Sequence, residues 1–124
     1  MDEATLYDAL GEPFFVQLVE DFYEFVEADE ILRPMYPDDL TEAKHHLVLF
    51  LIQYWGGPAQ YMAERGHPRL RMRHSPFRIT KRARDAWLAA MTGALERQRD
   101  RLTAEQFDEM ASYFEMAAHQ LRNV

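Results

Sequence analysis

A histidine surrounded by arginines is the clearest candidate for chemistry in the sequence. Residues 66–79 read GHPRLRMRHSPFRI, and His74 lies within this stretch. The arginines nearest to it are Arg69, Arg71, Arg73 and Arg78. In a chain with a formal net charge of -7, this local excess of cations suggests an anion held beside a metal. A haem has this chemistry, because a histidine ligates its iron and basic groups meet its propionates.

The helix that carries His74 must be short. Pro68 can open a helix, because its missing N–H would be unpaired there, and Pro76 biases Ser75 away from helical geometry. A helix of about two turns at most is therefore expected, and it would hold the imidazole in one orientation. On this stretch alone an alternative stays open, in which His74 only favours the dipole at a helix C-terminus.

Polar-tipped aromatic residues form a second group of candidates. They are Tyr23, Tyr36 and Trp87. Tyr23 follows Val19 by four residues and precedes Val26 by three, so its phenol should lie at the edge of a buried stripe. An ordinary core tyrosine whose hydroxyl reaches water is the alternative at this position. Trp87 lies on an otherwise apolar helix face, where a buried indole N–H needs an acceptor.

The composition restricts the kind of site. With 124 residues the chain is expected to be one domain, residues 1–124, with 48% hydrophobic residues for its core. The absence of cysteine excludes disulfides, a thiol nucleophile and cysteine-ligated zinc or iron–sulfur sites, so iron would need nitrogen or oxygen ligands. No apolar run reaches membrane-spanning length and no leader pattern opens the chain, so we expect a cytoplasmic protein without a membrane span.

The charge pattern favours a small anionic ligand over nucleic acid. Of the 21 acidic residues, 13 lie in positions 1–42, whereas eight of the 14 basic residues lie between Arg65 and Arg84. A nucleic-acid-binding chain should instead have a positive net charge, with aromatic residues interleaved in its basic patch.

Apolar spacing predicts helices throughout, and therefore an all-α fold. The expected elements are a helix over 4–10 stopped at Gly11, a helix over 13–28, a turn over 29–33, a helix from Asp39 to Trp55, a turn over 60–64, the helix before Pro76, a helix capped by Thr80 and a last helix capped by Thr103 with Gln106. The helix after Asp39 should lie across the centre of the fold, with His45 and His46 in solvent and one apolar face formed by Ala43, Leu47, Phe50, Leu51 and Tyr54. The last two helices have inner faces rich in alanine and methionine, which leave room for a flat apolar group.

The chain resembles the truncated haemoglobins of the second group. The resemblance rests on QYWGGP at 53–58, RGHPRLRMRHSPFRI at 65–79 and DAWL at 85–88, and it extends over nearly all 124 residues. It implies a two-on-two helical sandwich that encloses a haem. One departure is Gly11-Glu12, where the family tends to keep a glycine pair.

The resemblance also implies roles for individual residues. His74 matches the proximal iron ligand, and Tyr23, Tyr36 and Trp87 match the distal polar cluster. Ala43 stands where larger globins place a distal histidine. The other residues expected to bind the cofactor are Leu47 over the iron, Phe50 on the same helix, Arg73 and Tyr61 near the propionates, and also Met35, Phe77, Ile79, Met91 and Phe114.

The implied function is reversible binding of O2, CO and NO at a five-coordinate iron of haem b, iron protoporphyrin IX. We further expect redox chemistry, either removal of NO as nitrate or peroxidase-like oxidation, with an electron-donating reductase as partner. Oxygen transport, storage or sensing are alternatives within the same fold. A haem-free helical adaptor that binds an acidic partner through its arginine-rich stretch is the alternative from another class. Monomer and homodimer both stay open.

Overall fold

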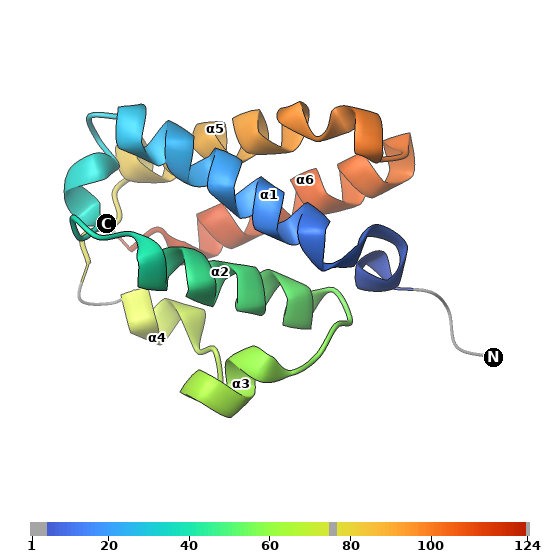
Figure 1. Cartoon of the computed structure of the whole chain (residues 1–124). Coiled ribbons are helices and arrows are strands. Elements are labelled where there is room, and N and C mark those ends of the chain that lie inside the picture. Colours follow the sequence, from blue (N-terminus) through green and yellow to red (C-terminus); the bar gives the residue numbers. More distant parts are fainter. Residues whose placement is uncertain (1–4, 75–76, 124) are drawn as a thin grey trace.

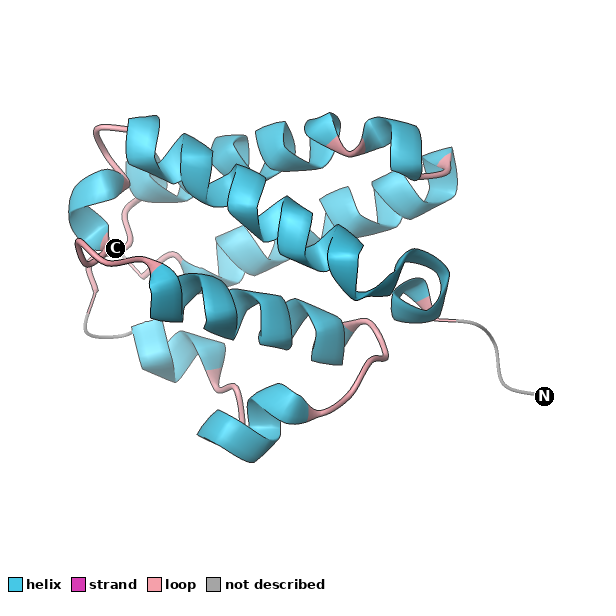
Figure 2. Cartoon of the chain, viewed as in Figure 1, coloured by secondary structure: helices cyan, strands magenta, loops and turns pink. Residues whose placement is uncertain are grey.

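A computed structural model describes residues 5–74 and 77–123, which are helical without any strand in these two ranges (Figures 1 and 2). The elements are α1 (Leu6–Ala28), η1 (Arg33–Met35), α2 (Thr41–Tyr54), α3 (Gln60–Arg65), α4 (Leu70–His74), α5 (Lys81–Arg97), η2 (Arg99–Arg101) and α6 (Ala104–Leu121). Ser75 and Pro76, on which the predicted end of the fourth helix rested, lie outside the described residues. Within the described ranges no helix is both long and apolar enough to cross a membrane.

The helices form two packed pairs. α1 packs against α2, α5 packs against α6, and the contact between α1 and α5 joins the two pairs. The core between them is rich in aromatic rings, with Phe14, Phe15 and Phe22 fully buried on α1. This is the all-α two-on-two sandwich that the resemblance implied.

α1 joins two helices that were expected to be separate. Thr5 caps it, because the Thr5 hydroxyl accepts from the Asp8 N–H at 3.0 Å and the Asp8 carboxylate accepts from the Thr5 N–H. The helix then kinks at Gly11, whose φ of 78° is readily adopted only without a Cβ. The glycine needed for the kink is therefore present, although the second glycine of the family pattern is Glu12.

The caps of the later helices agree with their predicted residues in two cases. The Thr80 hydroxyl accepts from the Ala83 N–H at 3.1 Å, and Thr103 with Gln106 forms a complete capping box. The cap of α2 differs from the prediction, because Leu40 is the N-cap residue and the Asp39 carboxylate accepts from the Thr41 N–H at 2.9 Å. Asp39 thus closes the turn before the helix.

The short elements differ from the predictions at their prolines. η1 continues through Pro34, which was expected to end the preceding turn. α4 begins at Leu70, because Arg69 has a φ of 42°, in the left-handed region, and so separates Pro68 from the helix. α4 therefore has only the five residues up to His74, fewer than Pro68 at its first position would have given.

Candidate functional site

Tyr23, Tyr36 and Trp87 come together from three separate segments. Tyr23 lies on α1, Tyr36 follows η1, and Trp87 lies on α5. The rings of Tyr23 and Tyr36 meet edge to face with centroids 5.6 Å apart, and the indole N–H of Trp87 donates to the Tyr36 hydroxyl oxygen. Phe22 supports the cluster, with its ring centroid 5.7 Å from that of Trp87. The three side chains therefore form one contiguous group.

Burial keeps both phenols of this group neutral. It raises the pKa of Tyr23 well above its ordinary value, and the neighbouring Tyr36 adds to the rise. It raises the pKa of Tyr36 to about 12, although donation from Trp87 acts in the opposite direction by stabilising the phenolate. Near neutral pH each phenol retains its proton and can donate a hydrogen bond.

α2 presents two apolar faces, and the protein buries only one of them fully. Leu49, Leu51 and Ile52 are buried in the core. The predicted apolar stripe is more open: Ala43, Leu47 and Phe50 are half-buried, and Tyr54 is 49% exposed. Ala43, Leu47 and Phe50 do pack against the core cluster, but only Leu51 of this stripe is fully buried, and Tyr54 lies at the surface. An apolar group placed against Leu47 and Phe50 would gain contact with surface that the chain leaves open.

His45 and His46 on α2 hold α3 in place. The Nε2 atom of His45 lies 2.9 Å from the Glu64 carboxylate, and the Nδ1 atom of His46 lies 3.4 Å from the Arg65 guanidinium. His45 is exposed as predicted, whereas His46 is half-buried, which corrects the expectation that it stands in solvent. Burial and the nearby Arg65 lower the pKa of His46.

His74 ends α4, which packs against α6. Its side chain is half-buried, and its ring centroid lies 6.4 Å from that of Phe77. Phe77 is itself 49% exposed. A single imidazole thus stands on a short helix beside apolar surface that is open to a ligand.

Asn123 fixes the backbone around His74 and was not predicted from the sequence. Its side-chain amide donates to the Phe77 carbonyl at 2.9 Å and to the His74 carbonyl at 3.4 Å. Its side-chain oxygen accepts from the Ile79 N–H at 2.9 Å, and its own N–H donates to the Ile79 carbonyl at 3.0 Å. A lone asparagine 49 positions away gives no sequence signal for this role.

Arg73 fixes the backbone on the other side of α4. Its guanidinium donates to the carbonyls of Pro68 and Arg65, each at 2.7 Å, and to the His67 carbonyl at 3.3 Å. These three hydrogen bonds use three of the five N–H donors of the Arg73 guanidinium. The remaining N–H donors could bind an anion. Its expected place near a propionate stays a prediction.

A shallow basic pocket of about 330 Å³ adjoins this loop. Its lining residues are Arg65, His67, Arg69, Met72 and Arg73. Tyr61, the other residue expected near the propionates, is buried on α3, with its ring 5.6 Å from that of Phe50 and 5.9 Å from the Arg65 guanidinium carbon. Cationic groups therefore gather on the segment that leads to His74.

The remaining residues expected to line a cofactor differ in burial. Ile79, Met91 and Phe114 are buried, and Met35 is half-buried. The Phe114 ring lies 6.2 Å from that of Trp87, whereas Met91 packs within the core cluster. Burial alone does not show which of these residues would face a cofactor, so their expected roles stay predictions.

These residues fit a haem. A haem requires a nitrogen ligand on one side, an apolar surface for the porphyrin, and basic groups for its carboxylates. His74, the open face of α2 and the guanidinium groups of Arg65, Arg69 and Arg73 have this chemistry. The neutral donors Tyr36 and Trp87 suit a ligand that gains negative charge.

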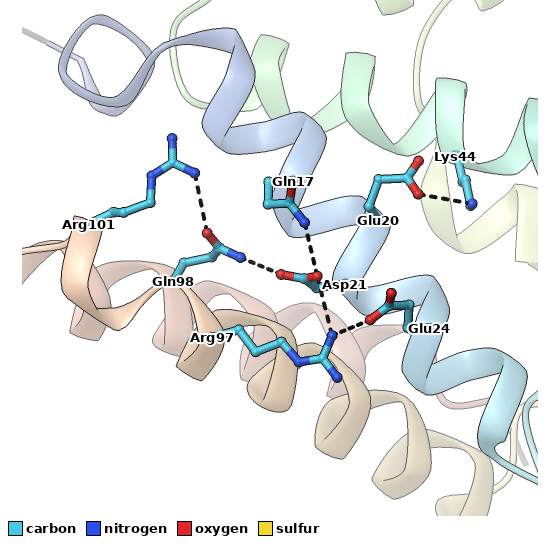
Figure 3. A network of polar contacts seen from close by, with 8 residues as sticks. All are labelled: Gln17, Glu20, Asp21, Glu24, Lys44, Arg97, Gln98 and Arg101. Atoms are coloured by element: carbon cyan, nitrogen blue, oxygen red, sulfur yellow. Dashed lines mark hydrogen bonds and ion pairs between the residues drawn. The ribbon is translucent and has the colours of Figure 1, made fainter.

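A buried polar network holds α1 against α5 two residues before Tyr23 (Figure 3). Asp21 is only 7% exposed, and its carboxylate accepts from the amides of Gln17 and Gln98 and from the Arg97 guanidinium, which also pairs with Glu24. Periodicity alone predicted nothing at Asp21, because Arg97 at the end of α5 and Gln98 just after it are more than 70 positions away. This network fixes the part of α1 from which Tyr23 projects.

Comparisons with known proteins agree with this geometry. The family model of the bacterial-like globins matches residues 5–121. A relative from Bacillus subtilis, group 2 truncated hemoglobin YjbI, is 49% identical over 90 residues, which are 73% of this chain and 68% of the relative. The structure of a hemoglobin from Chloroflexus aurantiacus superposes with a TM-score of 0.94 at 46% identity, covering 98% of this chain and 100% of that one.

A further solved structure is described as a truncated oxygen-avid haemoglobin from Bacillus subtilis. It superposes with a TM-score of 0.89 at 42% identity, and the match covers 94% of this chain and 98% of the other. The similarity to known structures thus extends over the segments that carry every candidate residue.

Proposed function

Because the chain belongs to the bacterial-like globins, as a group 2 truncated haemoglobin of a family that binds haem and oxygen, we propose that it binds haem b through His74 and takes up O2 reversibly. When bound, the haem would supply a ferrous iron with one coordination position open to O2, CO or NO. The observation that carries this proposal is the open apolar face of α2 at Leu47 and Phe50, in a molecule that presents one half-buried imidazole at the end of α4. The haem-free adaptor is not favoured.

Tyr36 is the first donor to a ligand in this proposal. In this proposal its oxygen accepts from the Trp87 indole, and its own O–H donates to the ligand. Trp87 can donate a hydrogen bond to the ligand directly only if it breaks its hydrogen bond to Tyr36. Tyr23 supports these two residues from α1. A hydrogen bond to a charged group contributes ~1.5–3 kcal/mol, so one such donor slows O2 release by about tenfold or more.

Slow release suits redox chemistry better than transport. The proposal therefore includes the conversion of NO and O2 to nitrate, or the peroxide-dependent oxidation of a reductant, with a reductase as electron donor. The neutral phenols of Tyr23 and Tyr36 can hold or pass a proton in either reaction. Repeated NO turnover in the presence of a reductase would distinguish this role from O2 storage, which predicts a single stoichiometric reaction.

The ultraviolet–visible spectrum of haem-loaded protein tests the central claim. We expect a strong Soret band that shifts on reduction with dithionite and again under CO, and that is weakened or lost in His74→Ala. His119→Ala is the matched control, because His119 is exposed and contacts Arg84 on the surface. A folded, colourless protein that ignores added haemin would contradict the proposal.

A further inference from the structure

Two tyrosine rings lie close together at a tilt near the surface, away from the distal cluster. Tyr54 ends α2 and Tyr113 lies on α6, and their ring centroids are 4.0 Å apart with an interplanar angle of 32°. Tyr54 is 49% exposed and Tyr113 is half-buried beneath it. This is the shortest centroid distance among the ring pairs of the described residues, and its members come from opposite helix pairs of the sandwich.

A short series of aromatic contacts connects this pair with the distal cluster. The Tyr113 ring lies 5.7 Å from that of Phe114, and the Phe114 ring lies 6.2 Å from that of Trp87, all measured between centroids. Trp87 in turn donates to Tyr36. The series therefore runs from an exposed phenol to the group proposed to face the ligand, with Phe114 as the only ring in it that is neither tyrosine nor tryptophan.

The burial of Tyr113 and the exposure of Tyr54 determine where a proton goes when one of the two phenols is oxidised. Burial, with Tyr54 beside it, raises the pKa of Tyr113 to about 12, so this phenol is neutral at physiological pH. A neutral phenol that loses an electron must also lose its proton. Tyr54 is 49% exposed, so water lies beside the pair to take up such a proton.

Resting on the proposed function, we propose that Tyr54 and Tyr113 form a surface oxidation site. This site supplies electrons to peroxide that is reduced at the proposed haem site. In the absence of another reductant the site cross-links itself. Each phenol loses one electron and one proton, and a carbon–carbon bond forms between ring positions next to the hydroxyls. Hydrogen peroxide accepts the two electrons and two protons, its O–O bond breaks, and two waters are released.

The same site identifies a class of reducing substrate. A phenol too large to enter the proposed haem site can donate an electron to the exposed Tyr54 ring. This electron replaces the one that the tyrosine pair has lost. Two phenols are then oxidised for each peroxide, and the tyrosine pair returns to its starting state. A soluble phenol should therefore suppress the cross-link in proportion to its own oxidation.

The test treats haem-loaded protein with one equivalent of hydrogen peroxide and no reductant, then identifies peptides by mass spectrometry. We expect a cross-linked peptide that contains Tyr54 and Tyr113. Its mass should be two hydrogen atoms below the sum of the two separate peptides, and it should have the blue fluorescence of dityrosine. Tyr54→Phe and Tyr113→Phe should each abolish it. Tyr7→Phe is the matched control, because Tyr7 is a half-buried tyrosine stacked on Phe15.

A second arm separates this inference from haem binding. Haem-free protein is oxidised with photoactivated ruthenium tris-bipyridine and persulfate, which removes electrons from exposed phenols without any haem. Joined peptide in both arms supports the proposal. A normal Soret band and consumption of peroxide without the joined peptide would overturn it, whatever the second arm shows. A missing Soret band would instead contradict the proposed function, and absence of the joined peptide from the ruthenium arm would then overturn the pair as an oxidation site.

Discussion

The side-chain amide of Asn123 donates hydrogen bonds to the main-chain carbonyl oxygens of both His74 and Phe77. These contacts join the chain just beyond α6 to the backbone that carries the proposed iron ligand. Arg73 ties the other end of α4 to the carbonyls of residues 65–68. A helix of only five residues contributes few hydrogen bonds of its own, so these two anchors help to fix the backbone that carries His74.

Asn123→Ala should loosen the proximal side of the site. It removes three side-chain hydrogen bonds, each contributing about 0.5–1.5 kcal/mol, and leaves the Ile79 N–H without its side-chain acceptor. We expect faster haem transfer to an acceptor globin, and faster amide exchange at residues 77–79 in the haem-free protein. Gln120→Ala, at an exposed position of α6, is the control, and equal haem transfer from both variants would contradict the role of Asn123.

Trp87→Phe should accelerate O2 dissociation by about tenfold, the effect of losing roughly 1.4 kcal/mol. Phenylalanine retains an aromatic contact with Phe22 and Phe114 but has no N–H to donate to Tyr36. Stopped-flow displacement of O2 by CO measures this rate. CO gains less negative charge when it binds, so CO dissociation should change much less and serves as an internal control. Unchanged O2 kinetics would show that Trp87 does not act on the ligand.

The helices were largely predictable because their signals are local. The Thr103–Gln106 capping box, the spacing of Phe15, Leu18 and Phe22, and the role of Gly11 as a break all depend on residues close in sequence. The side of α2 that the protein core covers was not predictable. That helix is apolar on two sides, and periodicity cannot tell which side a cofactor would cover. Asn123 was missed for a similar reason, since its partners lie 44 or more positions away.

The candidate site was predictable mainly through the resemblance. His74 stood out from its charged neighbours, but spacing alone could not bring Tyr23, Tyr36 and Trp87 together, because they come from three segments. The requirement that a buried indole N–H find an acceptor did predict a partner for Trp87. The structure identifies that partner as Tyr36.

The buried phenols should make the protein lose stability at alkaline pH. The pKa of Tyr36 rises from 10.0 unfolded to about 12 folded, and that of Tyr23 also rises, so the unfolded chain releases these protons first. The stabilisation is complete below pH 10 and is lost as the pH rises from 10 through the folded pKa, by roughly 2–3 kcal/mol for Tyr36 alone. Urea unfolding across this range tests the prediction. Tyr36→Phe should show a smaller loss, and an identical loss would contradict the assignment.

Asp21→Ala should destabilise the fold more than its single charge suggests. The substitution leaves the buried Gln98 amide without its acceptor and removes one of the two carboxylates that face Arg97. An unsatisfied buried polar group costs about 1–3 kcal/mol, so the loss of the acceptor for Gln98 should lower the free energy of unfolding by about that amount. Glu24→Ala is the matched control, because Glu24 meets the same arginine at the surface, where an ion pair contributes about 0–1 kcal/mol.

If denaturant unfolding gave equal losses for the two variants, the buried network would not be what holds α1 to α5. A larger loss in Asp21→Ala, accompanied by altered O2 release, would show that the network also fixes Tyr23 in the distal cluster.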